Sequence, residues 1–254
     1  MPELGCWVRQ IRERRKLPRE HAARDLHISK DLLKKIESSD ARCSPTVLND
    51  LVVAYDLDRV QERFTRDLAR PPVPLLPLED LRHRTMTAEH RAKLARLDDR
   101  EVAAAYIDPL WNLVLANSHF RATLPGTEQF SDNICLWFFH PGSSTLTAEH
   151  LIIEHRRTAA YLVATLRGAL GRHRDTPHAR AHFRELRGAA LFCEQWDTSV
   201  TVAYGRRLDD PVHLRDPTTG ELYSARIQLG DAPGSPDVRF CLCYRNPYSG
   251  PPLP

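Results

Sequence analysis

A short run with three lysines and an aspartate follows a serine near the amino end of the chain. A lysine ammonium group can donate to the O6 and N7 acceptors of guanine, and a carboxylate can accept from the N4 amine of cytosine. On an isolated helix, three lysines more often form a solvated face, so the surrounding elements must decide between the two interpretations. The candidate base-contacting residues are Lys30, Asp31, Lys34 and Lys35.

The lysine run is predicted to lie on the second of two short helices joined by a tight turn. The first helix spans about 18–26, begins at a proline and carries small alanines where another helix could cross closely. Ser29 can accept hydrogen bonds from the first backbone N–H groups of the second helix, which spans about 30–38. Two short helices joined by about three residues form the helix-turn-helix pattern.

Further helices are predicted on both sides of this pair, over residues 3–16 and from Pro45 and Asp58 onward. Together they predict an all-α, five-helix DNA-binding domain over residues 1–70. This range holds 15 Lys and Arg against 12 Asp and Glu, whereas the rest of the chain holds 21 of each sign. The net charge of +3 therefore lies entirely in the first domain, as expected for an anionic partner.

The segments LGCWVRQIRERRKLPREHAARDLHISKDLLKKIES and SPTVLNDLVVAYDL resemble the xenobiotic-response-element type of helix-turn-helix, found in many phage and bacterial repressors. The resemblance implies that the third helix lies in the major groove of operator DNA, with its lysines toward the bases. It implies phosphate contacts from Arg19, Ser29 and Arg42. It also implies a framework ion pair between Arg12 and Glu37.

His27 occupies the turn between the two short helices, where such domains often have a glycine in the left-handed conformation. Histidine tolerates this conformation less well than glycine, so we expect a tighter or shifted turn. A single domain with few cationic contacts should bind DNA weakly and lose affinity as salt rises. Specific binding therefore predicts a homodimer on paired half-sites.

The segment RPPVPLLPLED holds four prolines and predicts a stiff, extended connector over residues 71–86. A second domain should follow over residues 87–254. Its periodicity predicts a helix from Thr87, two short strands or one bent strand over 104–117, and a strand or buried helix over 133–142. It further predicts a helix from Thr147 that ends at Gly168–Gly171, a helix over 177–194, and strands over 199–205, 212–229 and 238–246. This order predicts an α+β domain with helices on one face of an antiparallel sheet.

Within the second domain, YIDPLWNLVLANSHFRATLPG, NICLWFFHPGSSTLTAEH, VHLRDPTTGELYSARIQL and VRFCLCYRN resemble the sensor half of the MmyB-like regulators. The resemblance implies a PAS-like fold and a small apolar ligand, because a related member holds a fatty acid. The basic stretch from His173 to Cys193 departs from the family, and FCEQWDTSVTVAYGRR matches it loosely. The identity of the ligand is therefore not carried over.

Aromatic residues of the second domain are the candidates for lining an apolar ligand site, since such sites are mostly apolar with a few polar groups. They serve equally well as ordinary core, and the sequence leaves both interpretations open. Three histidines could orient a carboxylate or simply lie at the surface. The aromatic candidates are Trp111, Phe120, Trp137, Phe138, Phe139 and Trp196, and the histidines are His140, His150 and His155.

The chain carries no phosphate loop, dinucleotide fingerprint, zinc-protease helix or nucleophile elbow, so we expect neither catalysis nor a cofactor. The six cysteines lack zinc-site spacing, and alternation places Cys241 and Cys243 on one strand face. We expect no metal, no membrane span and a cytoplasmic location. The sequence thus predicts a transcriptional regulator modulated by a small apolar ligand. The alternative is a DNA-binding protein whose second domain only dimerises or binds a protein.

Overall fold

The computed structural model describes residues 1–85, 87–140, 147–232 and 235–252. The N-terminal helices pack around a core that includes Trp7, Leu33 and Phe64, with Trp7 and Phe64 in an edge-to-face contact at 4.8 Å between ring centroids. These helices agree with the predicted DNA-binding fold. Their bounds are α1 Leu4–Arg14, α2 Arg19–Asp25, α3 Lys30–Glu37, α4 Pro45–Ala54 and α5 Arg59–Ala69.

Side-chain caps explain where three of these helices begin. The hydroxyl of Ser29 accepts from the N–H of Leu32 at 3.1 Å, and Ser44 caps α4 in the same way. Asp58 and Gln61 form a reciprocal capping box at the start of α5. Each cap satisfies N–H groups that a helix leaves without an internal partner, so the local sequence fixes these boundaries.

The predicted connector contains a helix. Residues 71–77 are extended, and the N–H of Val73 donates to the carbonyl of Arg172 at 2.8 Å. The helix α6, Leu78–Thr85, begins directly after the last proline, and α7, Ala88–Asp98, follows. Proline excludes a continuous helix only as far as Pro77, so the extended part is shorter than expected.

The strands of the second domain form an antiparallel sheet in the order β2-β1-β5-β4-β3. Every residue of β1 is buried, because α6 and α7 cover one face while Phe120 and Ile134 pack on the other. The expectation of helices on a single face is therefore wrong for this part of the sheet. The strand bounds are β1 Ala103–Ile107, β2 Leu113–Ala116, β3 Val212–Arg215, β4 Leu222–Ala232 and β5 Ser235–Pro247.

The helical layer corrects several expected boundaries. The ambiguous apolar run is a helix, and the long helix predicted from Thr147 is broken at Ile152. There the N–H of Ile153 donates to the carbonyl of His213 at 2.9 Å, and Ile152 bridges to Leu214. Residues 141–146 of the quoted motif lie outside the described residues. The bounds are α8 Ser118–Thr123, the 3-10 helix η1 Thr127–Phe130, α9 Ile134–Phe139, α10 Ala148–Leu151 and α11 His155–His173.

Two glycines predicted to end α11 instead lie inside it. A Cβ on Gly171 would stand 2.4 Å from the ring of Phe64, and a Cβ on Gly168 would stand 2.7 Å from the carbonyl oxygen of Ala203. The missing side chains let α5 and the segment 199–206 approach α11 closely. These glycines therefore serve packing and do not terminate the helix.

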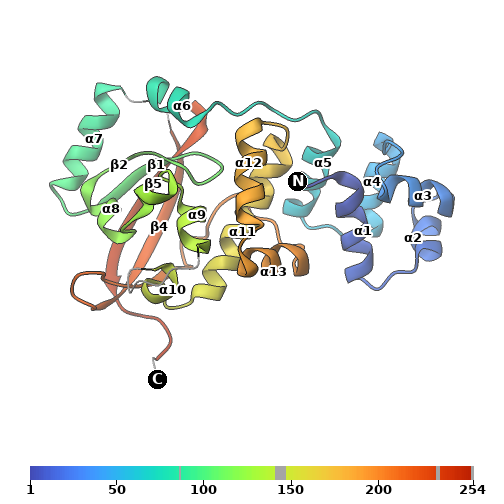
Figure 1. Ribbon diagram of the computed structural model, residues 1–254. Helices are drawn as coiled ribbons and strands as arrows, with labels where there is room; N and C mark the ends of the chain where they lie inside the picture. Colours follow the sequence, from blue (N-terminus) through green and yellow to red (C-terminus); the bar gives the residue numbers. More distant parts are fainter. Residues whose placement is uncertain (86, 141–146, 233–234, 253–254) are drawn as a thin grey trace.

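The remaining helical prediction is one helix that the structure divides in two, α12 Pro177–Leu186 and α13 Ala190–Thr198. The predicted strand at 199–205 is wrong, because this segment leaves the sheet and buries Val202 in the N-terminal core. Helices α11, α12 and α13 lie between the sheet and the N-terminal helices (Figure 1). Among the described residues, no helix has the length and apolar character needed to cross a membrane.

Candidate DNA-binding surface and ligand cavity

The lysine-bearing side of α3 faces solvent. Lys30, Lys34 and Lys35 are exposed, while Leu33 and Ile36 of the same helix are buried against the domain core. In Figure 1, α2 and α3 lie at the end of the molecule far from the sheet. The ammonium groups are thus neither turned inward nor covered by the second domain.

Acidic neighbours distinguish these lysines from one another. The Nζ of Lys30 lies 2.5 Å from Oε1 of Glu20, and both side chains are more than half exposed. In the described part of the chain, Lys34 and Lys35 form no ion pair. Asp31 is exposed in the first turn of α3. Lys30 must therefore leave Glu20 to contact DNA fully, whereas Lys34 and Lys35 need no such exchange.

Glu37 ties three helices together beneath this surface. Its carboxylate lies 2.5 Å from Nε of Arg12 and 2.7 Å from Nε of Arg19, and its side chain is 2% exposed. Burial by itself would raise the pKa of Glu37, but hydrogen bonds from Arg12 and Arg19 hold it below its ordinary value. The Arg12–Glu37 pair implied by the resemblance is present, and the second arginine was not expected.

The remaining predicted phosphate contacts lie around α3. Arg19 is one-third exposed, so the guanidinium N–H groups that do not meet Glu37 can still face a phosphate. Arg42 is exposed in the loop before α4, and Ser29 is the N-cap of α3. His27 adopts φ 53°, so the turn keeps the left-handed conformation with a histidine in place of glycine. DNA contact by these residues stays a prediction.

The second domain contains a partly open cavity of about 240 Å³ between the sheet and helices α8, α9 and α11. Four of the six aromatic candidates line it, namely Trp111, Phe120, Trp137 and Phe138. Trp111 adopts φ 67°, a conformation uncommon for a bulky residue and often found at functional sites. The aromatic cluster therefore supplies the wall of a cavity as well as core.

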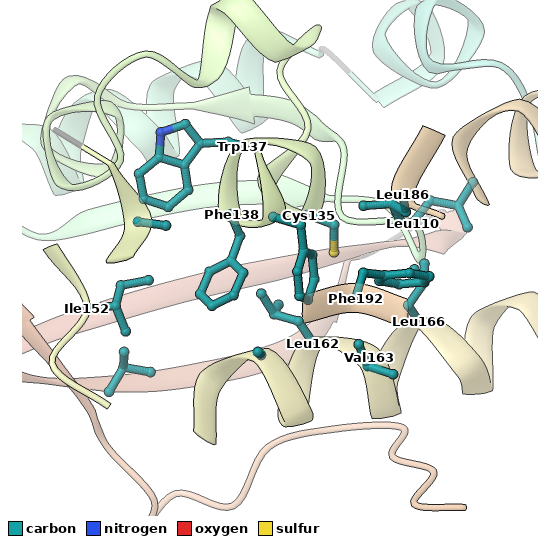
Figure 2. Packing of buried hydrophobic residues seen from close by; sticks show 14 of the residues in the cluster. Leu110, Cys135, Trp137, Phe138, Ile152, Leu162, Val163, Leu166, Leu186 and Phe192 are labelled. Carbon is teal, nitrogen blue, oxygen red and sulfur yellow. The ribbon is translucent and has the colours of Figure 1, made fainter. Parts of the chain in front are cut away.

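The other two aromatic candidates lie in the packed core. Phe139 meets Phe192 edge-to-face at 5.3 Å, and Trp196 stacks on Phe192 at 5.6 Å. Figure 2 shows that the two environments adjoin. Phe138 points from α9 toward Leu162 of α11, and Phe192 of α13 packs near Leu166, farther along α11. A role in ligand binding for Phe139 and Trp196 stays a prediction.

Strands β3, β4 and β5 contribute cavity residues that the sequence reasoning did not select. Alternating residues of β4 and β5 point to the same side, so a two-residue period was the available signal. Cys241 and Cys243 illustrate it, since their sulfur atoms lie 3.9 Å apart and both line the cavity. The further lining residues include Ile152, Leu162, Val212, Tyr223, Ala225 and Ile227.

Polar residues also line the cavity, among them Tyr161 and Arg206. The hydroxyl of Tyr161 is buried and has no hydrogen-bond partner among the described residues, and burial raises its pKa to about 12. The guanidinium of Arg206 lies 4.5 Å from the centroid of the Tyr161 ring, and the Arg206 side chain is 5% exposed. An unsatisfied buried hydroxyl is costly, so a ligand that offers Tyr161 an acceptor oxygen would gain a hydrogen bond here.

The three histidines occupy different environments. His140 and His150 are exposed, whereas His155 is half-buried and stacks on Phe138 at 4.4 Å between centroids. Burial lowers the pKa of His155, which favours the neutral ring. In the ranges the structure describes, no group of three or more His, Cys, Asp or Glu side chains could hold a metal ion.

An exposed cationic helix-turn-helix followed by a domain with an apolar cavity defines a class of DNA-binding regulator with a ligand-binding domain. Residues 86–249 match the MmyB-like transcription regulator ligand binding domain, and residues 3–64 match a helix-turn-helix domain. Because the first match covers more than half of the chain, the chain belongs to the MmyB-like transcription regulators. A comparison with curated proteins returned no match.

Proposed function

We propose that this transcription regulator reads a specific operator through α3 and that a small apolar, fatty-acid-like ligand in its cavity changes its affinity for DNA. The observation that carries the proposal is the exposed lysine face of α3, at the end of the molecule away from the sheet. A helix in this position can enter a major groove without displacing the second domain.

On the DNA side, Lys30, Lys34 and Lys35 would donate to guanine acceptors, and Asp31 would accept from cytosine. The phosphate contacts would come from Arg19, Ser29 and Arg42 and would set the register of α3 in the groove. One domain offers few such contacts. We therefore infer a homodimer that binds half-sites spaced by one or more helical turns.

On the ligand side, the cavity joins an aromatic and aliphatic wall to polar residues, among them Tyr161 and Arg206. This combination suits a molecule with an apolar chain and an acceptor oxygen, as a fatty acid has. Such a ligand regulates DNA binding only if it has different affinities for two arrangements of the DNA-binding domains. The cavity would then act as the sensor of the regulator.

The DNA part is tested by selecting genomic fragments with the purified full-length chain and sequencing the bound fraction. We expect a shared sequence with paired half-sites, and we expect the Lys30→Ala, Lys35→Ala double variant to lose its enrichment. Outside α3 the chain has no pair of exposed lysines that could serve as a control. The control is therefore Arg207→Ala, which removes an exposed cation of the second domain. Fragments without a common sequence would contradict specific binding.

The ligand part is tested by incubating the chain with lipid extract and recording native mass spectra. We expect retention of an acyl molecule, reduced in Ala225→Leu because this side chain would enter the cavity. The matched control is Ala160→Leu on the exposed side of α11. An empty cavity in every sample would favour the alternative function, in which the second domain dimerises or binds a protein.

A further inference from the structure

We propose that residues 199–206, here called the strap, transmit the state of the ligand cavity to helix α5, with Tyr204 as the positioning residue. This inference rests on the proposed function, because it names the route by which the cavity regulates the DNA-binding domain. It assigns a role to a segment that lies outside both the sheet and the helices.

One end of the strap belongs to the DNA-binding domain by its contacts. Val202 is buried in the same apolar cluster as Trp7 and Phe64. The hydroxyl of Tyr204 donates to the carboxylate of Asp67 at 2.9 Å. The guanidinium of Arg63 lies 3.8 Å from the centroid of the Tyr204 ring. Since Arg63 and Asp67 are one turn apart on α5, Tyr204 is fixed to that helix by two kinds of contact.

The other end of the strap reaches the ligand cavity. Arg206 lines the cavity and covers the ring of Tyr161, which also lines it. Trp111 and Tyr161 also line a second, smaller cavity of about 80 Å³, and Tyr204 and Arg63 line this cavity too. A ligand that moves either aromatic residue therefore also changes a cavity that Tyr204 and α5 help to form.

The strap cannot move independently of α11. The N–H of Ala203 donates to the carbonyl of Ala164 at 3.0 Å, and Gly168 leaves no room for a Cβ beneath the Ala203 carbonyl. Arg167 is buried and donates to the carbonyls of Thr201 and Trp196. From the sheet, Arg239 donates to the carbonyl of Tyr204 at 2.7 Å. Because these hydrogen bonds hold the strap to α11 and to the sheet, a displacement of either is passed on to the strap.

A second connection between the domains does not involve the cavity directly. Phe64 of α5 packs against Gly171 of α11, and Arg174 donates to the carbonyl of Asp67 at 3.2 Å. These residues hold the domains together, but in the described structure the lining of the larger cavity does not include them. The strap, by contrast, contacts both the cavity wall and α5, which makes it the transmitting element.

The test measures amide hydrogen exchange of α5, residues 59–69, in the full-length chain. The cavity is perturbed without any ligand by Ala225→Leu, or by Ile227→Phe if the first variant does not fold. Each is combined with Tyr204→Phe, which removes the hydroxyl that binds Asp67 and keeps the ring beneath Arg63. Tyr248→Phe is the matched control, because its hydroxyl bonds to Pro251 near the carboxyl end.

We expect cavity filling to change α5 exchange at least about twofold in the parent and the Tyr248→Phe backgrounds, and much less with Tyr204→Phe. An equal change in all three backgrounds, or no change in any, would overturn the role of the strap. Native mass spectra with dodecanoate, recorded on the same proteins, report the proposed ligand class separately. If dodecanoate binds but cavity filling leaves α5 exchange unaltered, the role of the strap alone is rejected. If dodecanoate does not bind but the exchange response depends on Tyr204, only the ligand class is rejected.

Discussion

The lysine face of α3 and the cavity of the second domain are built in opposite ways. The first is a set of exposed cations on one capped helix, whose other side buries Leu33, Ile36 and Glu37. The second is a partly open cavity whose walls come from strands and helices far apart in the chain. A candidate DNA-binding surface can therefore be predicted from a local sequence pattern. A cavity depends on how segments that are distant in the chain pack together.

The same contrast holds for electrostatics. Around α3 the buried charge is neutralised within the domain, since Glu37 meets two arginines while the lysines remain at the surface. In the second domain, burial shifts the pKa of individual groups, as it does for Tyr161. The lysines of the first region face solvent, whereas the cavity of the second is lined mainly by apolar side chains with a few charged ones such as Arg206.

The largest expected effect tests the charged framework of the first region. Glu37→Ala leaves the buried Arg12 guanidinium without its carboxylate partner, and we expect a loss of roughly 3 to 5 kcal/mol in the free energy of unfolding. Urea unfolding followed by tryptophan fluorescence measures it. The control is Asp175→Ala, whose half-exposed pair with Arg180 should contribute no more than about 0.5 kcal/mol.

A pH titration tests the buried second region. Burial lowers the pKa of His182 from 6.5 to about 4. As pH falls below about 6.5, the unfolded chain takes up a proton that the folded chain accepts only near pH 4, so stability should decline across that window by about 3 kcal/mol. The pH dependence of urea unfolding measures it. His182→Gln should flatten the decline, while the exposed control His150→Gln should leave it unchanged.

Operator binding should separate the surface lysines from the core. Lys30→Ala and Lys35→Ala together should weaken operator binding by roughly 1 to 3 kcal/mol without shifting the melting temperature, since both side chains are exposed. Fluorescence anisotropy at fixed salt measures the affinity. Unchanged binding by the double variant would remove α3 from the interface, and a lowered melting temperature would indicate that the lysines stabilise the fold.

The smallest expected effect concerns the acidic neighbour of one lysine. Glu20→Gln removes a negative charge beside DNA and releases Lys30 from its exposed ion pair. We expect non-specific DNA binding to tighten about twofold to fivefold at low salt and to approach the parent value as salt rises. Glu62→Gln, which removes a charge paired with Arg66 on α5, is the control. Identical tightening in the control would indicate a net-charge effect.

Much of the first domain could be predicted because its signals are local. Caps at Ser29, Ser44 and Asp58 fixed helix starts, and apolar periodicity identified the buried sides. The second domain was less predictable. The periodicity of the run at 134–139 suited a strand as well as a helix, and the glycines of α11 looked like a helix end because their close neighbours, Phe64 and Ala203, are distant in sequence.

The candidate sites divide along the same line. Trp111, Phe120, Trp137 and Phe138 were selectable as aromatics, but nothing local distinguished them from Phe139 and Trp196, which pack in the core. Tyr161 and Arg206 become notable only in the fold, where the buried Tyr161 hydroxyl has no hydrogen-bond partner among the described residues and the Arg206 guanidinium lies over the Tyr161 ring. Isolated residues give no sign of either property.

The sequence by itself determined the class of the N-terminal fold, the polarity of α3 and the α+β character of the second domain, because caps, periodicity and alternation act over a few residues. Only the tertiary structure decided where the cavity lies, which aromatics line it and how the strap joins Tyr204 to α5. These features depend on packing between segments more than a hundred residues apart, and such contacts leave no local pattern in the chain.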